Sequence, residues 1–413
     1  MKLIKIHYYS ISDIPGKKAH QIQTLKTVKA LSKFSKIWLI VSSSKSFKIK
    51  INDNFTLLKT KFKNINVKYF KGFQEILNNF LKVLNFLYIS YKLRLPDIFY
   101  CRDIFTAFIL NLLKILHKKP VIFEIHAIKY ITKEIDHLLW GTKKASKFKI
   151  FLMKLFISKI ELYSFKKSDR ILPITKIMGK ILNKKFKIPS NKIIAVPDAS
   201  DDYCDNEYSI ETCIDNILKL DIYRIVYLGS LAPIKGVDNL IIATKILKNT
   251  DLKFKTIIIG GDSKNIYRYK NLINKFNLKN NIIMTGFLSH KEALAIIKLC
   301  DLAIISLSKN VYSKFFVSPL KLFDYMSCKI PIIAPNFPSI SEVINNNKNG
   351  ILIEPDNPIK LAETIYNLLK NKSLRKKIGE NAFLSSRKYT WSKRAEKICN
   401  VIHQLNETHN KKS

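Results

Sequence analysis

Short apolar runs alternate with amphipathic segments along most of this chain, and this alternation constrains its fold more than any other feature. Such a pattern is typical of βα units built around parallel sheets. In the first half, the apolar runs predict strands at Leu3–Tyr9, Ile37–Val41, Ile98–Cys101, Val121–Ile125 and Ile171–Ile174. We therefore expect an α/β fold in which helices connect parallel strands.

A polar, acidic stretch around Val196–Asn206 interrupts the alternation, which then restarts. The second series predicts strands at Arg224–Leu228, Thr256–Ile259, Ile282–Thr285, Leu302–Ser306 and Ile332–Ala334, with helices at Asp238–Leu247 and Lys291–Leu299. Ser289 and Glu292 form a Ser-x-x-Glu capping box before the second of these helices. At 413 residues the chain exceeds what one hydrophobic core usually supports. We expect two Rossmann-like domains that face each other across a cleft.

The chain is strongly basic, with 72 Lys and Arg against 31 Asp and Glu and a formal net charge of +41. Such a charge attracts nucleic acid, anionic membrane surfaces and polyanionic substrates. The chain is also rich in Lys, Ile and Asn, as AT-rich coding sequence tends to produce, and we assign about half of the excess to that bias. The charge by itself therefore indicates no particular partner.

Cysteine usage and hydropathy indicate a cytoplasmic protein. The cysteines lie far apart, without a Cys-x-x-Cys pair, at Cys101, Cys204, Cys213, Cys300, Cys328 and Cys399. This spacing excludes a zinc ribbon and argues against a disulfide framework. The first residues lack the apolar core and cleavage site of a signal peptide, and no run approaches the ~20 apolar residues that span a bilayer.

The segment from Ser318 to Met326 has the pattern of a helix start that binds an anion. Ser318 can cap the helix, and Pro319 suits the first helical position. The amides of Leu320 and Lys321 then point outward at the positive end of the helix dipole, where a phosphate binds well. Asp324 lies one turn further on and could accept hydrogen bonds from sugar hydroxyls. Taken alone, the segment fits an ordinary capped surface helix as well.

Glycines follow several predicted strands of the second series. Gly229 allows close backbone approach at the carboxyl end of a strand, where ligands of open α/β sheets bind, and Lys235 follows as a charge suited to a diphosphate. Gly260 and Gly261 make room either for a ligand or for a tight turn. The stretch Gly286-Phe287 could meet a nucleobase, which is a weaker signal.

In the first series, His126 lies at the carboxyl end of the strand Val121–Ile125, where it could face a ligand or serve as a structural histidine. Gly16 follows the first strand and would allow close approach to the same place. Lys17 and Lys18 come next and could attract anions.

These motifs resemble glycosyltransferase family 4. The segments that carry the resemblance are GSLAPIKGVDNLIIA, IIIGGD, IIMTGFLSHKEA and the long run SPLKLFDYMSCKIPIIAPNFPSISEVINNNKNGILIEP, with DIPGKKAHQIQTLKTVKAL, YCRD, VIFEIH, SDRILPIT and WSKRAEKICNVIHQL elsewhere. The family consists of retaining enzymes with the GT-B fold. The resemblance implies an acceptor-binding domain over 1–205, a nucleotide-sugar-binding domain over 206–385, and a final helix over 386–413 that packs back on the first domain.

The resemblance also implies roles for individual residues. The basic contact of the diphosphate falls on Lys235, and the ribose-binding acid, normally Glu, falls on Asp324. The amides around Ser318–Lys321 would face the diphosphate, and His126 would lie by the transferred sugar. The donor would be a UDP-, GDP- or ADP-sugar, with no metal and no cofactor. His126, Lys235 and Asp324 are thus the expected catalytic residues.

Two positions depart from the family pattern. Phe316 stands where the first acid of the paired-glutamate motif would be, and Ser230 stands where many members have Arg. A noncatalytic nucleotide-sugar-binding homologue is therefore an alternative. A basic nucleic-acid-binding protein is a second one, although no zinc-finger spacing or RNA-binding aromatic signature supports it. A GT-B epimerase or phosphorylase fits the segment from Ser318 less well.

The segment Lys143–Lys167 is both basic and strongly apolar. It is either an interfacial helix that holds the enzyme on an anionic membrane or a core helix with lysines on its wet side. The first interpretation would place the protein on the inner face of the cytoplasmic membrane, close to a lipid-linked or glycan acceptor. We accordingly expect a role in cell-surface polysaccharide, lipopolysaccharide or glycolipid synthesis.

Overall fold

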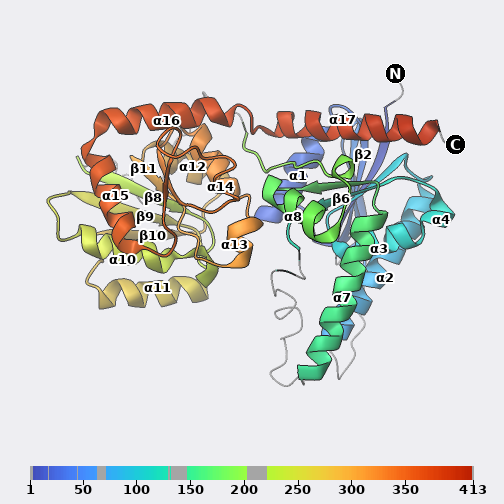
Figure 1. The fold of residues 1–413 in the computed structure, drawn as a ribbon, viewed down its shortest axis with the longest axis horizontal. Helices are drawn as coiled ribbons and strands as arrows, with labels where there is room; N and C mark the ends of the chain where they lie inside the picture. Colours follow the sequence, from blue (N-terminus) through green and yellow to red (C-terminus); the bar gives the residue numbers. More distant parts are fainter. Residues whose placement is uncertain are drawn as a thin grey trace. The chain divides into compact units, whose positions relative to one another are not determined.

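The computed structural model describes residues 3–16, 18–43, 45–62, 71–128, 131, 147–201 and 221–411. Lys17, Cys204, Cys213 and the parts of two predicted segments at 143–146 and 202–206 lie outside the described residues. The chain divides into two compact units (Figure 1). Unit 1 comprises Met1–Pro197 and Trp391–Ser413, and unit 2 comprises Asp198–Thr390.

Unit 1 contains a seven-stranded sheet with the order β3-β4-β2-β1-β5-β6-β7. Neighbouring strands are parallel except for β3 and β4, which form an antiparallel pair at one edge. The strands are β1 (Lys5–Ser10), β2 (Lys36–Ser43), β3 (Phe47–Asn52), β4 (Phe55–Lys61), β5 (Ile98–Cys101), β6 (Val121–Ile125) and β7 (Arg170–Pro173).

Helices pack on both faces of this sheet (Figure 1). They are α1 (Ala19–Leu31), α2 (Lys71–Lys92), α3 (Ile104–Leu112), α4 (Lys114–His117), α7 (Lys147–Lys167), α8 (Lys176–Phe186), α17 (Trp391–Asn410) and the 3₁₀ turn η1 (Ser190–Lys192). Tyr9 of β1 stacks on Phe86 of α2, and its neighbour Tyr8 points to the opposite face, where it stacks on Tyr100 of β5. The C-terminal helix α17 packs against α1. Although it follows unit 2 in the sequence, this helix is therefore part of unit 1.

Unit 2 contains a six-stranded parallel sheet with the order β10-β9-β8-β11-β12-β13. Its strands are β8 (Tyr223–Leu228), β9 (Phe254–Ile259), β10 (Ile282–Gly286), β11 (Leu302–Ile304), β12 (Ile332–Pro335) and β13 (Ile351–Ile353). The order changes direction beside β8, and in open α/β sheets ligands bind at such a switch point, outside the carboxyl ends of the strands.

Two buried clusters, one on each face of this sheet, hold unit 2 together. The first packs β-strand side chains against α10 (Val237–Leu247), α11 (Ser263–Lys275) and α15 (Pro358–Lys370). The second packs them against α12 (His290–Lys298), α14 (Leu320–Ser327) and α16 (Lys372–Ser386). The short elements η2 (Pro233–Lys235) and α13 (Val311–Phe315) lie in the loops after β8 and β11.

The predicted α/β architecture with two Rossmann-like sheets is confirmed. Ser289 and Glu292 form the predicted capping box, with α12 starting at His290. The strands β3 and β13, which lie at sheet edges, and β4, which lies between β3 and β2, were not predicted. In β3, Lys alternates with Phe and Ile and every side chain is exposed, whereas β13 has only three residues. Neither run has the continuous apolar character that marks a strand buried on both faces.

Within the described part of the chain, no helix combines the length and the apolar character needed to cross a bilayer. The cysteines described are free thiols: Cys101, Cys300, Cys328 and Cys399.

Candidate functional site

Two glycines lie side by side at the carboxyl ends of β8 and β9. Both have positive φ angles, +139° at Gly229 and +109° at Gly260. A β-carbon on Gly260 would lie 2.4 Å from the carbonyl oxygen of Gly229, and one on Gly229 would lie 2.8 Å from Nζ of Lys321. The glycine at position 229 therefore makes room for the Lys321 ammonium, and that at 260 makes room for the neighbouring backbone.

The start of α14 is held over the end of β8. The Leu228 amide donates a hydrogen bond of 2.7 Å to the Tyr325 hydroxyl. The Lys321 ammonium lies 3.8 Å from the centre of the Tyr227 ring, and the Tyr227 hydroxyl donates to the Ser230 carbonyl at 2.8 Å. Lys321 thus rests on an aromatic face that is itself fixed by the loop after β8.

Lys235 ends the turn η2, and its carbonyl accepts a hydrogen bond of 2.9 Å from the Ser306 hydroxyl. Burial lowers the pKa of Lys235. Burial, and then the charge of Lys235, lower the pKa of Lys321 well below its usual value. Among the residues that the structure describes, neither ammonium forms an ion pair. Two neighbouring cations without a carboxylate form a site that attracts an anion.

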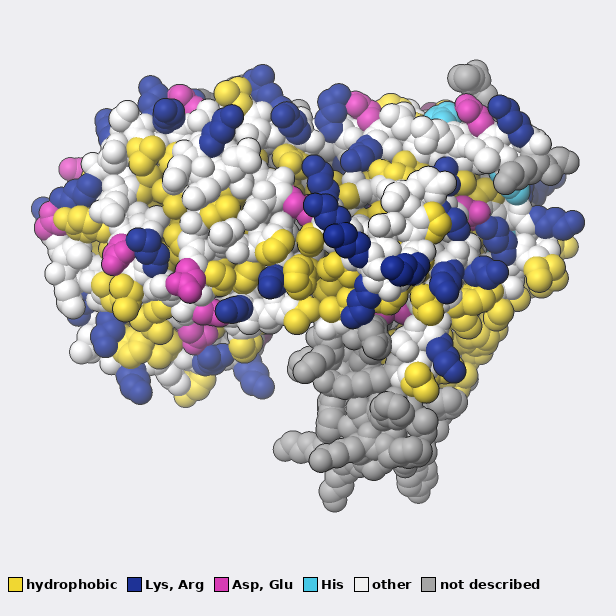
Figure 2. All heavy atoms as spheres, viewed as in Figure 1, with side chains coloured by type: hydrophobic (Ala, Val, Ile, Leu, Met, Phe, Trp, Pro, Cys, Tyr) yellow, Lys and Arg dark blue, Asp and Glu magenta, His cyan; other side chains and the backbone are white. Residues whose placement is uncertain are grey.

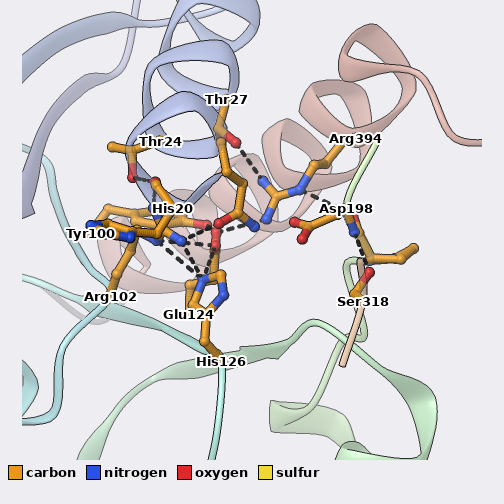
Figure 3. Close-up of polar contacts among 12 residues, drawn as sticks. His20, Thr24, Thr27, Tyr100, Arg102, Glu124, His126, Asp198, Ser318 and Arg394 are labelled. Carbon is orange, nitrogen blue, oxygen red and sulfur yellow. Dashed lines mark hydrogen bonds and ion pairs between the residues drawn. The ribbon is translucent and has the colours of Figure 1, made fainter. Parts of the chain in front are cut away.

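The predicted helix cap at Ser318 is wrong. The helix α14 begins at Leu320, Pro319 occupies the N-cap position with an extended backbone, and no side chain caps the helix. The Ser318 hydroxyl instead accepts a hydrogen bond of 3.0 Å from the Asp198 amide (Figure 3). Because its hydroxyl is used there, the first amides of the helix receive no side-chain cap, and Leu320 and Lys321 still stand at its positive end.

Asp324 is buried in α14, and its carboxylate Oδ2 lies 3.2 Å from Nε2 of His290. His290 was not predicted as a site residue, although it opens α12 within the SHKEA motif. Phe316, which replaces the family acid, is fully buried in the core. The structure therefore gives Asp324 a histidine partner and position 316 a packing role.

The remaining glycines differ in their surroundings. A β-carbon on Gly261 would lie 2.4 Å from Leu231, so this position is set by packing. Gly286 has a φ of +71°, and a β-carbon there would lie 3.8 Å from Cδ1 of Ile266, an ordinary contact distance. Phe287 beside it is 54% exposed. Ser230 is exposed as well. The contact of Gly286 and Phe287 with a nucleobase stays a prediction.

In unit 1, His126 belongs to a buried charge cluster around Glu124 of β6 (Figure 3). One carboxylate oxygen of Glu124, Oε2, accepts a hydrogen bond from the Tyr100 hydroxyl and lies 3.0 Å from Nη2 of Arg394. The other oxygen, Oε1, lies 2.7 Å from Nε2 of His126 and 3.4 Å from Nε of Arg102. A buried carboxylate of this kind requires such partners, since an unpaired one is costly.

The protonation states in this cluster follow from its charges. Burial raises the pKa of Glu124, but Arg394, the hydrogen bond to His126 and Arg102 together hold it well below its usual value. Burial and then Arg102 lower the pKa of His126 to about 4. Near neutral pH, Glu124 is therefore ionised and His126 is neutral.

Gly16 lies beside Gln21 in the loop after β1. A β-carbon on Gly16 would lie 2.2 Å from Oε1 of Gln21, which also accepts a hydrogen bond of 3.0 Å from the Lys18 amide. Lys18 is the N-cap residue of α1. The absence of a side chain at Gly16 thus makes room for Gln21 at the start of α1. The predicted approach of Gly16 to a ligand stays a prediction.

The structure brings together Gly229, Lys235, Gly260 and Lys321 in unit 2. The first three were predicted from strand ends, and Lys321 was predicted from the helix start. Sequence reasoning missed Arg102, Glu124 and Arg394, although each lies in a motif quoted for the resemblance. The signal that could have found Glu124 is a single acid inside an otherwise apolar strand, because such an acid needs buried partners. Over the described ranges, no group of three or more His, Cys, Asp or Glu side chains is arranged to hold a metal ion.

Comparisons with known proteins connect this geometry to an enzyme family. Residues 215–385 match the family described as Glycosyl transferases group 1. An uncharacterized glycosyltransferase of Methanocaldococcus jannaschii is 27% identical over 62% of this chain and 72% of its own length.

Solved structures share the fold at low sequence identity. Sucrose-phosphate synthase from Thermosynechococcus elongatus has a TM-score of 0.77 at 13% identity, covering 98% of this chain and 100% of its own. HepE of Anabaena, solved in complex with UDP-glucose, has a TM-score of 0.69 at 12% identity, covering 97% and 100%.

Proposed function

We propose that this chain, which belongs to the glycosyl transferases group 1 family and has the GT-B fold, is a retaining glycosyltransferase that works without a metal ion. It would move a sugar from a UDP-, GDP- or ADP-sugar to a glycan or lipid-linked acceptor. The observation that carries the proposal is the pair of ammonium groups, Lys235 and Lys321, that lie without a carboxylate partner in the described structure of unit 2. A diphosphate supplies the charge that this pair lacks.

Each part of the donor has a proposed contact in unit 2. The diphosphate lies against Lys235, Lys321 and the amides at the start of α14, where charge and helix dipole both favour an anion. The ribose hydroxyls donate hydrogen bonds to Asp324. The base packs on Phe287, whose ring is exposed beside Gly286.

The chemistry follows from where charge develops. When the bond between the sugar's anomeric carbon and the diphosphate oxygen breaks, negative charge grows on the leaving diphosphate, and the ammonium groups stabilise it without needing to reorganise. The acceptor hydroxyl forms its bond to the same face of the anomeric carbon and gives its proton to the departing phosphate. We assign His126 the contact with the transferred sugar, where its neutral state keeps it a hydrogen-bonding group rather than a cation.

The acceptor is proposed to be a glycan precursor or lipid-linked molecule met at an anionic membrane, in cell-surface polysaccharide, lipopolysaccharide or glycolipid synthesis. The described side chains of α7 are mixed: Leu155 and Phe156 are exposed, whereas Ile157 and Ile160 are buried. On α2, an apolar stripe is exposed, formed by Phe80, Leu84, Tyr88 and Tyr91. Figure 2 shows hydrophobic side chains gathered over α2 and α4 on one face of unit 1. Apolar and basic side chains together suit a peripheral position on such a membrane.

A turnover assay tests the proposal and its noncatalytic alternative. Purified protein is incubated with UDP-, GDP- and ADP-sugars and an acceptor pool from cell extract, and release of nucleoside diphosphate is measured for wild type, Lys235→Ala and the control Lys279→Ala. Lys279 is exposed and lies before the amino end of β10, whereas Lys235 follows the carboxyl end of the parallel strand β8. We expect release with one donor class, at least tenfold slower in Lys235→Ala and unchanged in Lys279→Ala. Donor binding without release would favour the noncatalytic homologue.

The metal requirement has its own test in the same assay. Because two ammonium groups and a helix start are already positioned to take the charge of the leaving group, we expect turnover to persist in excess EDTA. Loss of turnover in EDTA, restored by Mg²⁺ or Mn²⁺, would contradict a metal-independent mechanism.

A further inference from the structure

The C-terminal helix contributes a buried arginine to the centre of unit 1 (Figure 3). The side chain of Arg394 is 2% exposed. Its Nε donates to the Pro197 carbonyl at 3.1 Å, its Nη1 donates to the Thr27 hydroxyl at 3.0 Å, and its Nη2 lies 3.0 Å from Oε2 of Glu124. One side chain of α17 thus contacts α1, the chain after η1 and β6.

Glu124 contacts both Arg394 and His126, and so links the two side chains. The carboxylate is 1% exposed, with Arg394 at Oε2 and both His126 and Arg102 at Oε1. Two guanidinium groups surround one carboxylate, so each guanidinium matters for keeping it ionised and fixed in the interior. Removing Arg394 would leave Arg102 as the remaining guanidinium in contact with the carboxylate.

The position of His126 depends on this carboxylate. Nε2 of His126 lies 2.7 Å from Oε1 of Glu124 and 2.7 Å from Nη2 of Arg102. A protonated Nε2 donates to Glu124, whereas an unprotonated Nε2 accepts from Arg102. The charges of the cluster therefore determine whether Nε2 of His126 is hydrogen-bonded to Glu124 or to Arg102. The side chain of His126 is 27% exposed.

We propose that Arg394 is a positioning residue for sugar transfer: by fixing and balancing Glu124, it sets the orientation and protonation of His126. This inference rests on the proposed function through the contact assigned to His126. It gives the last helix a role in the reaction in addition to its packing against α1.

The direction of the effect follows from the charges around His126. Among the described residues, the charged or titratable groups on the elements packed around it are Tyr8 of β1, His20 of α1, Tyr100, Cys101 and Arg102 at the end of β5, Glu124 of β6 and Arg394 of α17. Arg394 lowers the pKa of His126 and Glu124 raises it. Loss of Arg394 should therefore raise this pKa above about 4, and loss of the Glu124 charge should lower it.

Histidine NMR titration measures this directly. The full-length protein carries labelled histidine, and His126→Gln identifies the His126 signal. The variants are Arg394→Met, Arg394→Lys, Glu124→Gln and the control Lys393→Met, which removes a charge from the exposed neighbouring position on the same helix. We expect a higher pKa for His126 in Arg394→Met, a lower one in Glu124→Gln, and values close to wild type in Arg394→Lys and Lys393→Met. An unchanged pKa in both Arg394→Met and Glu124→Gln would overturn the proposal.

Kinetics then separate positioning from stability. Neutral His126 is the active form, so activity falls as the pH drops through its pKa, and Arg394→Met should move this acid limb to higher pH. We expect its kcat to fall at least tenfold with the donor KM changed less than twofold, and Arg394→Lys to recover most of the kcat. The double variant with Glu124→Gln should be no slower than the slower single variant, because both act through one contact.

The outcomes distinguish the two proposals. If Arg394→Met does not fold by circular dichroism, Glu124→Gln still tests the carboxylate through which Arg394 would act, since a folding defect does not shift the His126 pKa downward. An unchanged His126 pKa in Glu124→Gln would then overturn the proposal. If the wild type turns over no nucleotide sugar, the proposed function fails, and the NMR titration still shows whether Arg394 controls His126. Unchanged pH profiles with lowered thermal stability would reduce Arg394 to a structural residue.

Discussion

At the residue scale, the proposed donor site depends on two ammonium groups, those of Lys235 and Lys321, which have no acidic partner among the described residues. Lys321 lies over Tyr227 beside Gly229, and both burial and Lys235 disfavour its charged form. Such an arrangement costs stability in the free protein, and a bound anion relieves that cost. Strained or electrostatically unfavourable positions of this kind are common where a ligand completes a site.

Lys321 should therefore make nucleotide binding sensitive to alkaline pH. Its folded-state pKa lies below the usual value, so the unfolded chain binds more protons in the interval between the two values, and the stability of the free protein rises with pH there. A diphosphate favours the charged lysine, so its affinity should fall as pH rises through the same interval. Calorimetric titration with nucleoside diphosphate should show this decline in wild type and a flatter, weaker profile in Lys321→Met. Equal pH profiles would contradict the assignment.

Asp324 provides a second prediction at this scale. It keeps the carboxylate that the family normally presents on Glu, and it lies beside His290. Losing a charge-assisted hydrogen bond costs about 1.5–3 kcal/mol, so Asp324→Asn should weaken nucleoside diphosphate binding roughly tenfold or more. Asp324→Glu should bind like wild type in the same titration. Comparable affinity in the Asn variant would remove Asp324 from the ribose contact.

Part of the site was predictable from the types of residue that follow the predicted strands. Gly229 and Lys235 were identified because a glycine and a lysine follow a strand of a parallel sheet. The use of Ser318 was not predictable, because its partner, the Asp198 amide, lies 120 residues earlier in the chain. The Glu124 cluster was missed for the same reason: Arg394 lies 270 positions after Glu124, and no local pattern connects them.

At the element scale, the carboxyl ends of β8 and β9 require glycine for different reasons than the end of β10. Gly229 and Gly260 are crowded by Lys321 and by backbone, whereas a β-carbon on Gly286 would make only an ordinary contact of 3.8 Å with Ile266. The alternation of strands and helices predicted most of these elements because buried parallel strands are continuous apolar runs. The edge strand β3 escaped prediction because it is exposed.

The glycine variants should differ accordingly. Positive φ angles strain any other residue by about 1–3 kcal/mol, so Gly286→Ala and Gly260→Ala should both lower the free energy of unfolding. In Gly260→Ala the added methyl also meets the Gly229 carbonyl at 2.4 Å, which adds a further cost of about 1–3 kcal/mol. Urea unfolding of the two variants measures the difference. Equal losses would show that the two strand ends are not packed as described.

At the scale of the whole molecule, the excess of basic residues is spread over both units. Figure 2 shows Lys and Arg side chains scattered over the visible surface of each unit, with hydrophobic side chains between them. Composition indicated this charge but could not say where it lies, because side-chain placement depends on the fold. On the visible face, this scattered distribution supports weak, salt-sensitive attraction to anionic surfaces.

Membrane association should accordingly depend on both charge and apolar contact. We expect the protein to sediment with liposomes that contain anionic lipid at low salt and to be released in part at raised salt, with no binding to neutral liposomes. Replacing the exposed aromatic residues of α2, Tyr88→Ser with Tyr91→Ser, should weaken binding at both salt concentrations. The absence of binding at low salt would end the membrane proposal and leave the donor site untouched.

We propose that Lys235 and Lys321 hold the diphosphate of a nucleotide sugar, and thermal unfolding in the presence of nucleotides tests this contact. A panel of UDP, GDP and ADP with their sugars is measured on wild type, Lys235→Ala and the control Lys279→Ala. We expect at least one nucleoside diphosphate to raise the unfolding temperature of wild type and Lys279→Ala, and to raise that of Lys235→Ala much less. An equal rise in Lys235→Ala, or no rise with any nucleotide, would contradict the account.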